Sequence, residues 1–138
     1  MNKHTLAAAL AFVMLPSIAS PAEPLTVPDV IKRHHVLTGQ TVDIIGWLSS
    51  CKGFDCILWP DEQAMRVPRL SNPPIFIGEA ADELERSMAA AASHTIVLRV
   101  RVTKDCWFDD KLSCTDRADR VQPLKLVEII RPAASKPE

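Results

Sequence analysis

Four cysteines, arranged as two pairs around short loops, restrict the fold of this 138-residue chain more than any other feature. Cys51 and Cys56 enclose the loop KGFD, and Cys106 and Cys114 enclose WFDDKLS. Runs of β-branched and apolar residues flank the first pair, which is typical of a hairpin. Directly opposed residues at a hairpin end have a Cα separation that suits a disulfide. The spacing therefore favours one bridge within each pair, although four cysteines allow three connectivities.

The first residues indicate that the chain is exported. Lys3 precedes an uninterrupted apolar run from Leu6 to Leu15, and Ser20-Pro21-Ala22 provides small residues for cleavage. This pattern predicts a cleavable signal peptide over residues 1–22 and a periplasmic or secreted protein. The apolar run is too short for a membrane anchor, which needs about 20 residues. Because small exported domains commonly carry disulfides, we predict the Cys51–Cys56 and Cys106–Cys114 bridges.

Two other roles for the cysteines fit the sequence less well. Zinc sites usually space paired cysteines by two to four residues, and the second pair here is separated by seven. A catalytic redox pair usually reads C-x-x-C at the start of a helix, whereas strand-forming residues surround Cys56. We therefore expect structural disulfides, with metal binding and thiol–disulfide redox chemistry as the lesser alternatives.

Within the mature chain, residues 23–132 are predicted to form one mainly β domain, followed by a disordered tail over 133–138. Thr26 or Asp29 can cap a short helix that Pro28 opens and Gly39 ends. Residues 61–74 are predicted to be a loop. Alternation or β-branched content predicts five strands, and an alanine-rich 3.6-residue period predicts a helix over 79–94. The predicted strands are 41–50, 55–60, 74–79, 95–106 and 124–132.

Five strands with a helix between the third and fourth are the order of an OB-fold, a partly open Greek-key barrel. The segments LTGQTVDIIGWLSS and CILWP resemble the first two strands of bacterial secreted OB-fold proteins. In that resemblance, Gly46 is the mid-strand glycine that lets the first strand bend. The resemblance implies an OB-fold-like barrel over residues 25–131, and it carries no agreed activity.

Hairpin register gives an expectation for the tryptophans. With Cys51 opposite Cys56, counting back places Leu48 opposite Trp59 and Ser49 opposite Leu58. Trp59 would then lie in the core, and Trp47 would lie on the outer face. An outward Trp47 indicates a surface for a partner, unless the N-terminal helix covers it.

The candidate ligand or partner-binding residues lie in the predicted loops and on one strand face. OB-folds commonly bind ligands on strands 2 and 3 between the loops that join strands 1–2 and 4–5. Aromatic rings beside a lysine can stack on bases or sugars, although the same rings can simply cover the barrel end. Arg99 and Arg101 share a strand face and can grip an anion, or can pair with Asp43 or Glu128. The candidates are Trp47, Lys52, Phe54, Arg99, Arg101, Trp107 and Phe108.

No catalytic motif, cofactor motif or metal site is recognisable in the sequence. Removing residues 1–22 takes away one lysine and changes the net charge from −1 to −2, which argues against nucleic acid as a partner. We expect a monomeric binding module for a small ligand, a glycan or an envelope protein. A structural or assembly protein of the cell envelope is the alternative.

Overall fold

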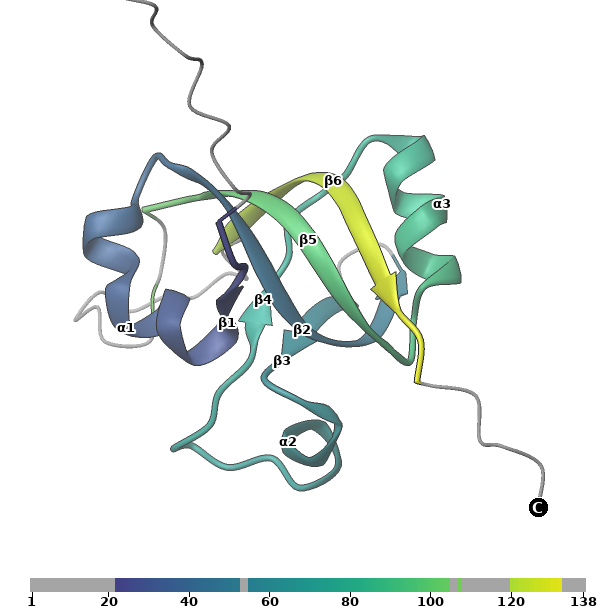
Figure 1. The fold of residues 1–138 in the computed structure, drawn as a ribbon, viewed down its shortest axis with the longest axis horizontal. Coiled ribbons are helices and arrows are strands. Elements are labelled where there is room, and N and C mark those ends of the chain that lie inside the picture. Colours follow the sequence, from purple (N-terminus) through teal and green to yellow (C-terminus); the bar gives the residue numbers. More distant parts are fainter. Residues whose placement is uncertain (1–21, 53–54, 105–106, 108–119, 133–138) are drawn as a thin grey trace, which may run out of the picture.

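The structure is a computed structural model that describes residues 22–52, 55–104, 107 and 120–132. It is mainly β, with one twisted sheet and three helices (Figure 1). The strands are β1 (Leu25–Thr26), β2 (Thr41–Lys52), β3 (Asp55–Trp59), β4 (Ile75–Phe76), β5 (His94–Val102) and β6 (Val121–Ile130). The helices are α1 (Val27–Leu37), α2 (Glu62–Arg66) and α3 (Asp82–Ala90).

The sheet runs in the order β4-β3-β2-β5-β6, and these neighbours are antiparallel. The short strand β1 pairs with β2 in parallel, beside Ile44 and Ile45. The outer strands approach each other at one isolated parallel bridge, Ile77 with Val121, where the Gly78 N–H also donates to the Val121 carbonyl over 2.9 Å. Strand ladders therefore do not close the sheet into a barrel within the described part of the chain.

The hydrophobic core lies between the inner face of the sheet and the helices α1 and α3. Helix α1 packs against β2, and α3 contacts both β2 and β6, near the opposite end of the sheet (Figure 1). Ile44 and Leu48 of β2 are fully buried there, together with Leu58 of β3 and Leu98 of β5. Alternate residues of the strands supply this face, as the period of two in the sequence predicts.

The predicted ends of the first helix are confirmed. Thr26 caps α1, and its hydroxyl accepts a hydrogen bond from the Asp29 N–H over 3.2 Å. Gly39 follows the helix with φ of 80°, a left-handed conformation that glycine adopts without steric penalty. The Gly39 N–H then donates to the Val102 carbonyl over 2.8 Å, which ties the end of the helix to β5.

Gly46 is required by a close approach of the neighbouring segments. A β-carbon at this position would lie 2.7 Å from the Trp59 carbonyl oxygen and 2.8 Å from Leu58 Cγ. Val27 of α1 closes the same space at 3.0 Å. The absence of a side chain at Gly46 therefore lets the backbone of β2 lie close to the end of β3 and to the start of α1.

The prediction of a five-stranded, partly open OB-fold-like barrel is corrected in several places. Six strands form, because Leu25 and Thr26 add β1. The third predicted strand, 74–79, is observed only over Ile75–Phe76. It is short because prolines precede it and because Ile77, which follows it, bridges Val121 instead. The predicted loop 61–74 contains α2, which is capped by the Asp61 carboxylate on the Ala64 N–H over 2.7 Å.

The last strand also departs from the prediction, because it begins at Val121 rather than at residue 124. Pro123 lies within it, opposite Val100, although proline cannot donate a ladder hydrogen bond. The strand accommodates this residue because β6 is an outer strand and its register shifts between Arg99 and Val100. The shift leaves Leu124 as an extra residue on β6, and its side chain is exposed.

Candidate functional site

A β-bulge at Ser49 and Ser50 sets which side chains of the β2–β3 hairpin face outward. Leu48 pairs with Leu58 and Cys51 pairs with Cys56, so two residues of β2 lie opposite one residue of β3. The predicted pairing of Leu48 with Trp59 is therefore wrong by one residue. Because side chains alternate between faces, this shift moves Trp59 from the core to the outer face, opposite Trp47.

The bulge also fixes the indole of Trp59. Its Nε1–H donates to the Ser49 hydroxyl over 3.2 Å, and that hydroxyl in turn reaches the Ile57 carbonyl over 3.5 Å. Ser50 makes a similar contact with the Asp55 carbonyl over 3.3 Å. The two serines thus compensate for backbone hydrogen bonds that the bulge removes. Ser49 also orients the Trp59 ring, which borders the neighbouring pocket.

This pocket, which we call the Arg120 pocket, lies between the outer face of β3 and β4 and the segment that joins them. Its volume is about 280 Å³. Its apolar walls are Trp59, Pro68, Leu70, Pro73, Pro74 and Phe76. Two cations, Arg69 and Arg120, complete the lining. Leu70 is 83% exposed at the surface, so an apolar group that entered the pocket would find additional apolar contact there.

Arg120 gives the pocket its chemical character. Its guanidinium carbon lies 5.3 Å from the centroid of the Phe76 ring, within the range of a cation–π contact. The side chain is half-buried, and this burial lowers the pKa of Arg120 from its usual value. No carboxylate among the described residues forms an ion pair with it. The pocket therefore holds a partly desolvated positive charge against an aromatic wall.

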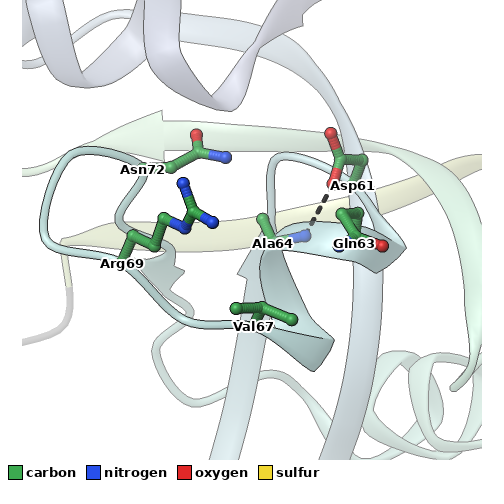
Figure 2. Close-up of a pocket in the computed structure, with 6 residues that line it drawn as sticks. All are labelled: Asp61, Gln63, Ala64, Val67, Arg69 and Asn72. Atoms are coloured by element: carbon green, nitrogen blue, oxygen red, sulfur yellow. Dashed lines mark hydrogen bonds between the residues drawn. The ribbon is translucent and has the colours of Figure 1, made fainter.

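A second, more polar hollow shares the lining residue Arg69 with the Arg120 pocket. We call it the Asn72 hollow, and Figure 2 shows the residues that line it. It measures about 260 Å³ and is lined by Asp61, Gln63, Ala64, Val67, Arg69 and Asn72. Arg69 lines both spaces, and its carbonyl accepts a hydrogen bond from the Asn72 N–H over 3.0 Å. The turn from Arg69 to Asn72 thus forms the wall between the two spaces.

The Cys51–Cys56 disulfide lies beside a third, acidic hollow. The bridge is formed as predicted, and both cysteines are buried. It excludes the two connectivities that would link Cys51 or Cys56 to the second pair. Glu79, Asp82 and Glu85 line a space of about 190 Å³ next to the sulfurs. Nearby negative charge disfavours a thiolate, so these surroundings suit a structural bridge better than a reactive one.

The predicted arginine pair is not a free anion site. Arg99 forms a bidentate ion pair with Asp43. Its Nε donates to Asp43 Oδ1 over 2.9 Å, and its Nη2 donates to Asp43 Oδ2 over 3.2 Å. The hydrogen bond and the charge of Asp43 raise the pKa of Arg99. Arg101 is exposed and lies opposite Gln122 in the sheet. The alternative that one of these arginines pairs with Asp43 is thus the one observed.

The other predicted residues that the structure describes do not gather into one site. Trp107 is 2% exposed, stacks on His34 with ring centroids 4.7 Å apart, and donates to the Thr103 carbonyl over 2.8 Å. Trp47 is half-buried, and its Nε1–H is buried without a hydrogen-bond partner among the described residues. Lys52 is exposed beside the disulfide. Phe54, Phe108, Cys106 and Cys114 lie outside the described residues.

The sequence-based search missed the residues that form the Arg120 pocket. The sequence predicts a core position for Trp59 and does not point to Phe76 or Arg120 as binding residues. One signal was present: RVPRLSNPP, residues 66–74, combines prolines with an isolated leucine directly before an apolar strand. A connection of this kind holds a fixed shape and leaves apolar groups at the surface.

The described segments show neither a metal-binding cluster nor a membrane-spanning helix. No group of three or more histidine, cysteine or acidic side chains in them is placed to hold a metal ion. None of their helices has the length and apolar character needed to cross a membrane. Comparisons of the chain with protein-family models, curated proteins and solved structures found no match.

Proposed function

We propose that this protein is an exported, OB-fold-like binding module whose Arg120 pocket binds a carboxylate attached to an apolar or aromatic group. The observation that carries the proposal is the half-buried guanidinium of Arg120, which contacts Phe76 and has no carboxylate partner among the residues described. A desolvated cation is unfavourable unless an anion compensates it. A ligand carboxylate can accept two parallel hydrogen bonds from a guanidinium.

The order of the strands supports the OB-fold-like part of the proposal, and the position of the pocket agrees with it. The sheet order β4-β3-β2-β5-β6 corresponds to strands 3-2-1-4-5 of a five-stranded Greek-key barrel, with α3 between the third and fourth strands. The parallel bridge between Ile77 and Val121 lies where such a barrel would bring its third and fifth strands together. In that correspondence the Arg120 pocket lies on strands 2 and 3, the face that OB-folds commonly use.

Export and a role in binding rather than catalysis are parts of the same proposal. The signal-like residues 1–22 and the Cys51–Cys56 disulfide both favour an oxidising compartment. Among the described residues, the lining of the Arg120 pocket combines two cations with apolar walls and has no nucleophile beside a general base. Such a lining can hold an anion but offers no group that would activate one.

The size of the pocket limits the ligand. A cavity of about 150 Å³ holds a benzene molecule, so about 280 Å³ suits one ring with a short acidic chain. The probe 3-phenylpropionate has this size. With about 0.4 kcal/mol for each of its non-hydrogen atoms, its dissociation constant should be about 1 mM.

The test is an NMR titration of the three indole N–H signals with 3-phenylpropionate. The Trp59 signal should shift in a saturable way, and the signal of buried Trp107 serves as an internal reference. The uncharged amide of the probe should bind at least about tenfold more weakly. Equal shifts with the acid and the amide, or no shift at Trp59, would refute the proposal.

A matched pair of variants locates the charge that matters. Arg120→Gln removes the pocket cation, whereas Arg66→Gln removes an exposed arginine that pairs with Glu62 on α2 and does not line the pocket. Both variants change the net charge equally. Only Arg120→Gln should abolish the acid-dependent shift of Trp59.

A further inference from the structure

Beside the Arg120 pocket, the Asn72 hollow has the composition of a site for a polypeptide backbone. Two amide side chains, Gln63 and Asn72, offer both donors and acceptors. Asp61 and Arg69 bring opposite charges to the lining, so the hollow itself has no net charge. A peptide unit also carries one donor and one acceptor without a net charge. Figure 2 shows Arg69 and Asn72 pointing into this space, across from Asp61 and Gln63.

The two spaces differ in a way that sets a direction for a ligand that occupies both. The Arg120 pocket has cations and apolar walls, and no acidic residue in the described part of the chain lines it. The Asn72 hollow contains the Asp61 carboxylate, whose Oδ1 is already engaged by the Ala64 N–H. A second ligand carboxylate would be repelled there, whereas a backbone N–H would find an acceptor.

The wall between the spaces is the Arg69–Asn72 turn, and the next residue, Pro73, lines the Arg120 pocket. An extended chain that leaves the pocket over this turn would pass the apolar surface of Leu70, which is 83% exposed. Val67 is 48% exposed in the Asn72 hollow. Val67 does not line the Arg120 pocket, so its apolar surface would be contacted only by a ligand that extends into the Asn72 hollow.

We infer that the ligand is the C-terminal end of an extended polypeptide with an apolar last residue. Its terminal carboxylate pairs with Arg120, its last side chain fills the space between Trp59 and Phe76, and its preceding backbone crosses the turn to Asn72. This inference rests on the proposed function, which requires only the carboxylate and the apolar group. It adds the second space and the polypeptide nature of the ligand.

The experiment compares three probes by the Trp59 indole shift and by calorimetry. The first is an acetylated hexapeptide that ends in leucine and phenylalanine with a free carboxylate, and the second is the same peptide with a C-terminal amide. The third is N-acetylphenylalanine, which can fill the Arg120 pocket alone. The free hexapeptide should bind at least about tenfold more tightly than N-acetylphenylalanine, and the amide should lose most of this affinity.

The variant Asn72→Ala separates the two spaces. It should weaken the hexapeptide about fivefold, by loss of one hydrogen-bonding group, and leave the affinity for N-acetylphenylalanine unchanged. Arg66→Gln, in the same segment, should change neither affinity. A circular dichroism spectrum like that of the wild type shows that the variants are folded.

The outcomes distinguish this inference from the function on which it rests. If N-acetylphenylalanine binds as tightly as the hexapeptide and depends on Arg120, the polypeptide inference is wrong and the carboxylate pocket stands. If Asn72→Ala weakens both probes equally, the second space has no separate role and the inference is also wrong. If no free acid shifts Trp59, both proposals fall.

Discussion

At one end of β3, Cys56 is covalently joined to Cys51, both cysteines are buried, and Ser50 bonds to the neighbouring backbone. At the other end, Trp59 borders a pocket in which Arg120 has no carboxylate partner among the described residues. The first end is closed by a disulfide and a serine hydrogen bond. The second end presents a charged side chain and apolar surface to solvent. Under the proposed function, one end of this short strand therefore serves stability and the opposite end serves binding.

Gly46 lies where β2 comes closest to Leu58 and Trp59 of β3. Its substitution should have the largest effect on stability, because the strain would affect the whole of β3. Gly46→Ala would place a methyl group 2.7 Å from the Trp59 carbonyl and 2.8 Å from Leu58. We expect a loss of about 3 kcal/mol in the free energy of unfolding, measured by urea denaturation.

The control for this variant is Gly39→Ala, because a β-carbon at Gly39 meets nothing within 4 Å. It should lose only about 1 kcal/mol, from backbone strain at positive φ. Equal losses at the two glycines would show that the close approach of β2 to β3 has no special importance.

Removing the bridge by Cys51→Ser with Cys56→Ser should have the next largest effect, on the first end of β3 alone. The loop closed by the bridge is short, so chain entropy predicts a loss of about 2 kcal/mol in unfolding free energy. The affinity for 3-phenylpropionate should stay within about twofold of the wild type. A loss of binding as large as that in Arg120→Gln would remove the distinction between the two ends.

The serine pair of the bulge offers a finer comparison. Ser49→Ala removes the acceptor of the Trp59 indole, and Ser50→Ala removes a contact with the Asp55 carbonyl. Each should lose about 1 kcal/mol in stability. Only Ser49→Ala should shift the Trp59 indole signal and weaken 3-phenylpropionate, by about threefold. An equal binding defect in Ser50→Ala would mean that the orientation of Trp59 is not what matters.

The sequence predicts the β-rich character, the ends of the first helix and the Cys51–Cys56 bridge, because these depend on short-range patterns and on residue types with strong local preferences. It does not predict the register of the hairpin. Ser49 and Ser50 look like any polar strand end, and one extra residue reverses the face of every residue that follows. The error over Trp59 follows directly from this.

The candidate site was less predictable, because its residues are distant in the chain. Arg120 comes 44 residues after Phe76, and only the folded sheet brings its guanidinium over that ring. Arg99 looked equally available in the sequence, and its pairing with Asp43 depends on the β2–β5 register. Which of two arginines lacks a partner is thus a property of the tertiary structure.

The smallest expected change in stability, and the most direct test of the central claim, concerns Arg120→Met in urea denaturation with and without 3-phenylpropionate. Without ligand, the loss of a cation–π contact of about 0.5–1 kcal/mol should be offset by removal of a half-buried, unpaired charge. The unfolding free energy should then stay within about 0.5 kcal/mol of the wild type.

With the ligand at about ten times its dissociation constant, the wild type should gain about 1.4 kcal/mol in unfolding free energy, and the variant should gain nothing. This result would place Arg120 in binding rather than in the stability of the fold. If Arg120→Met instead loses more than about 1.5 kcal/mol without ligand, or gains as much from the ligand as the wild type does, the account is contradicted.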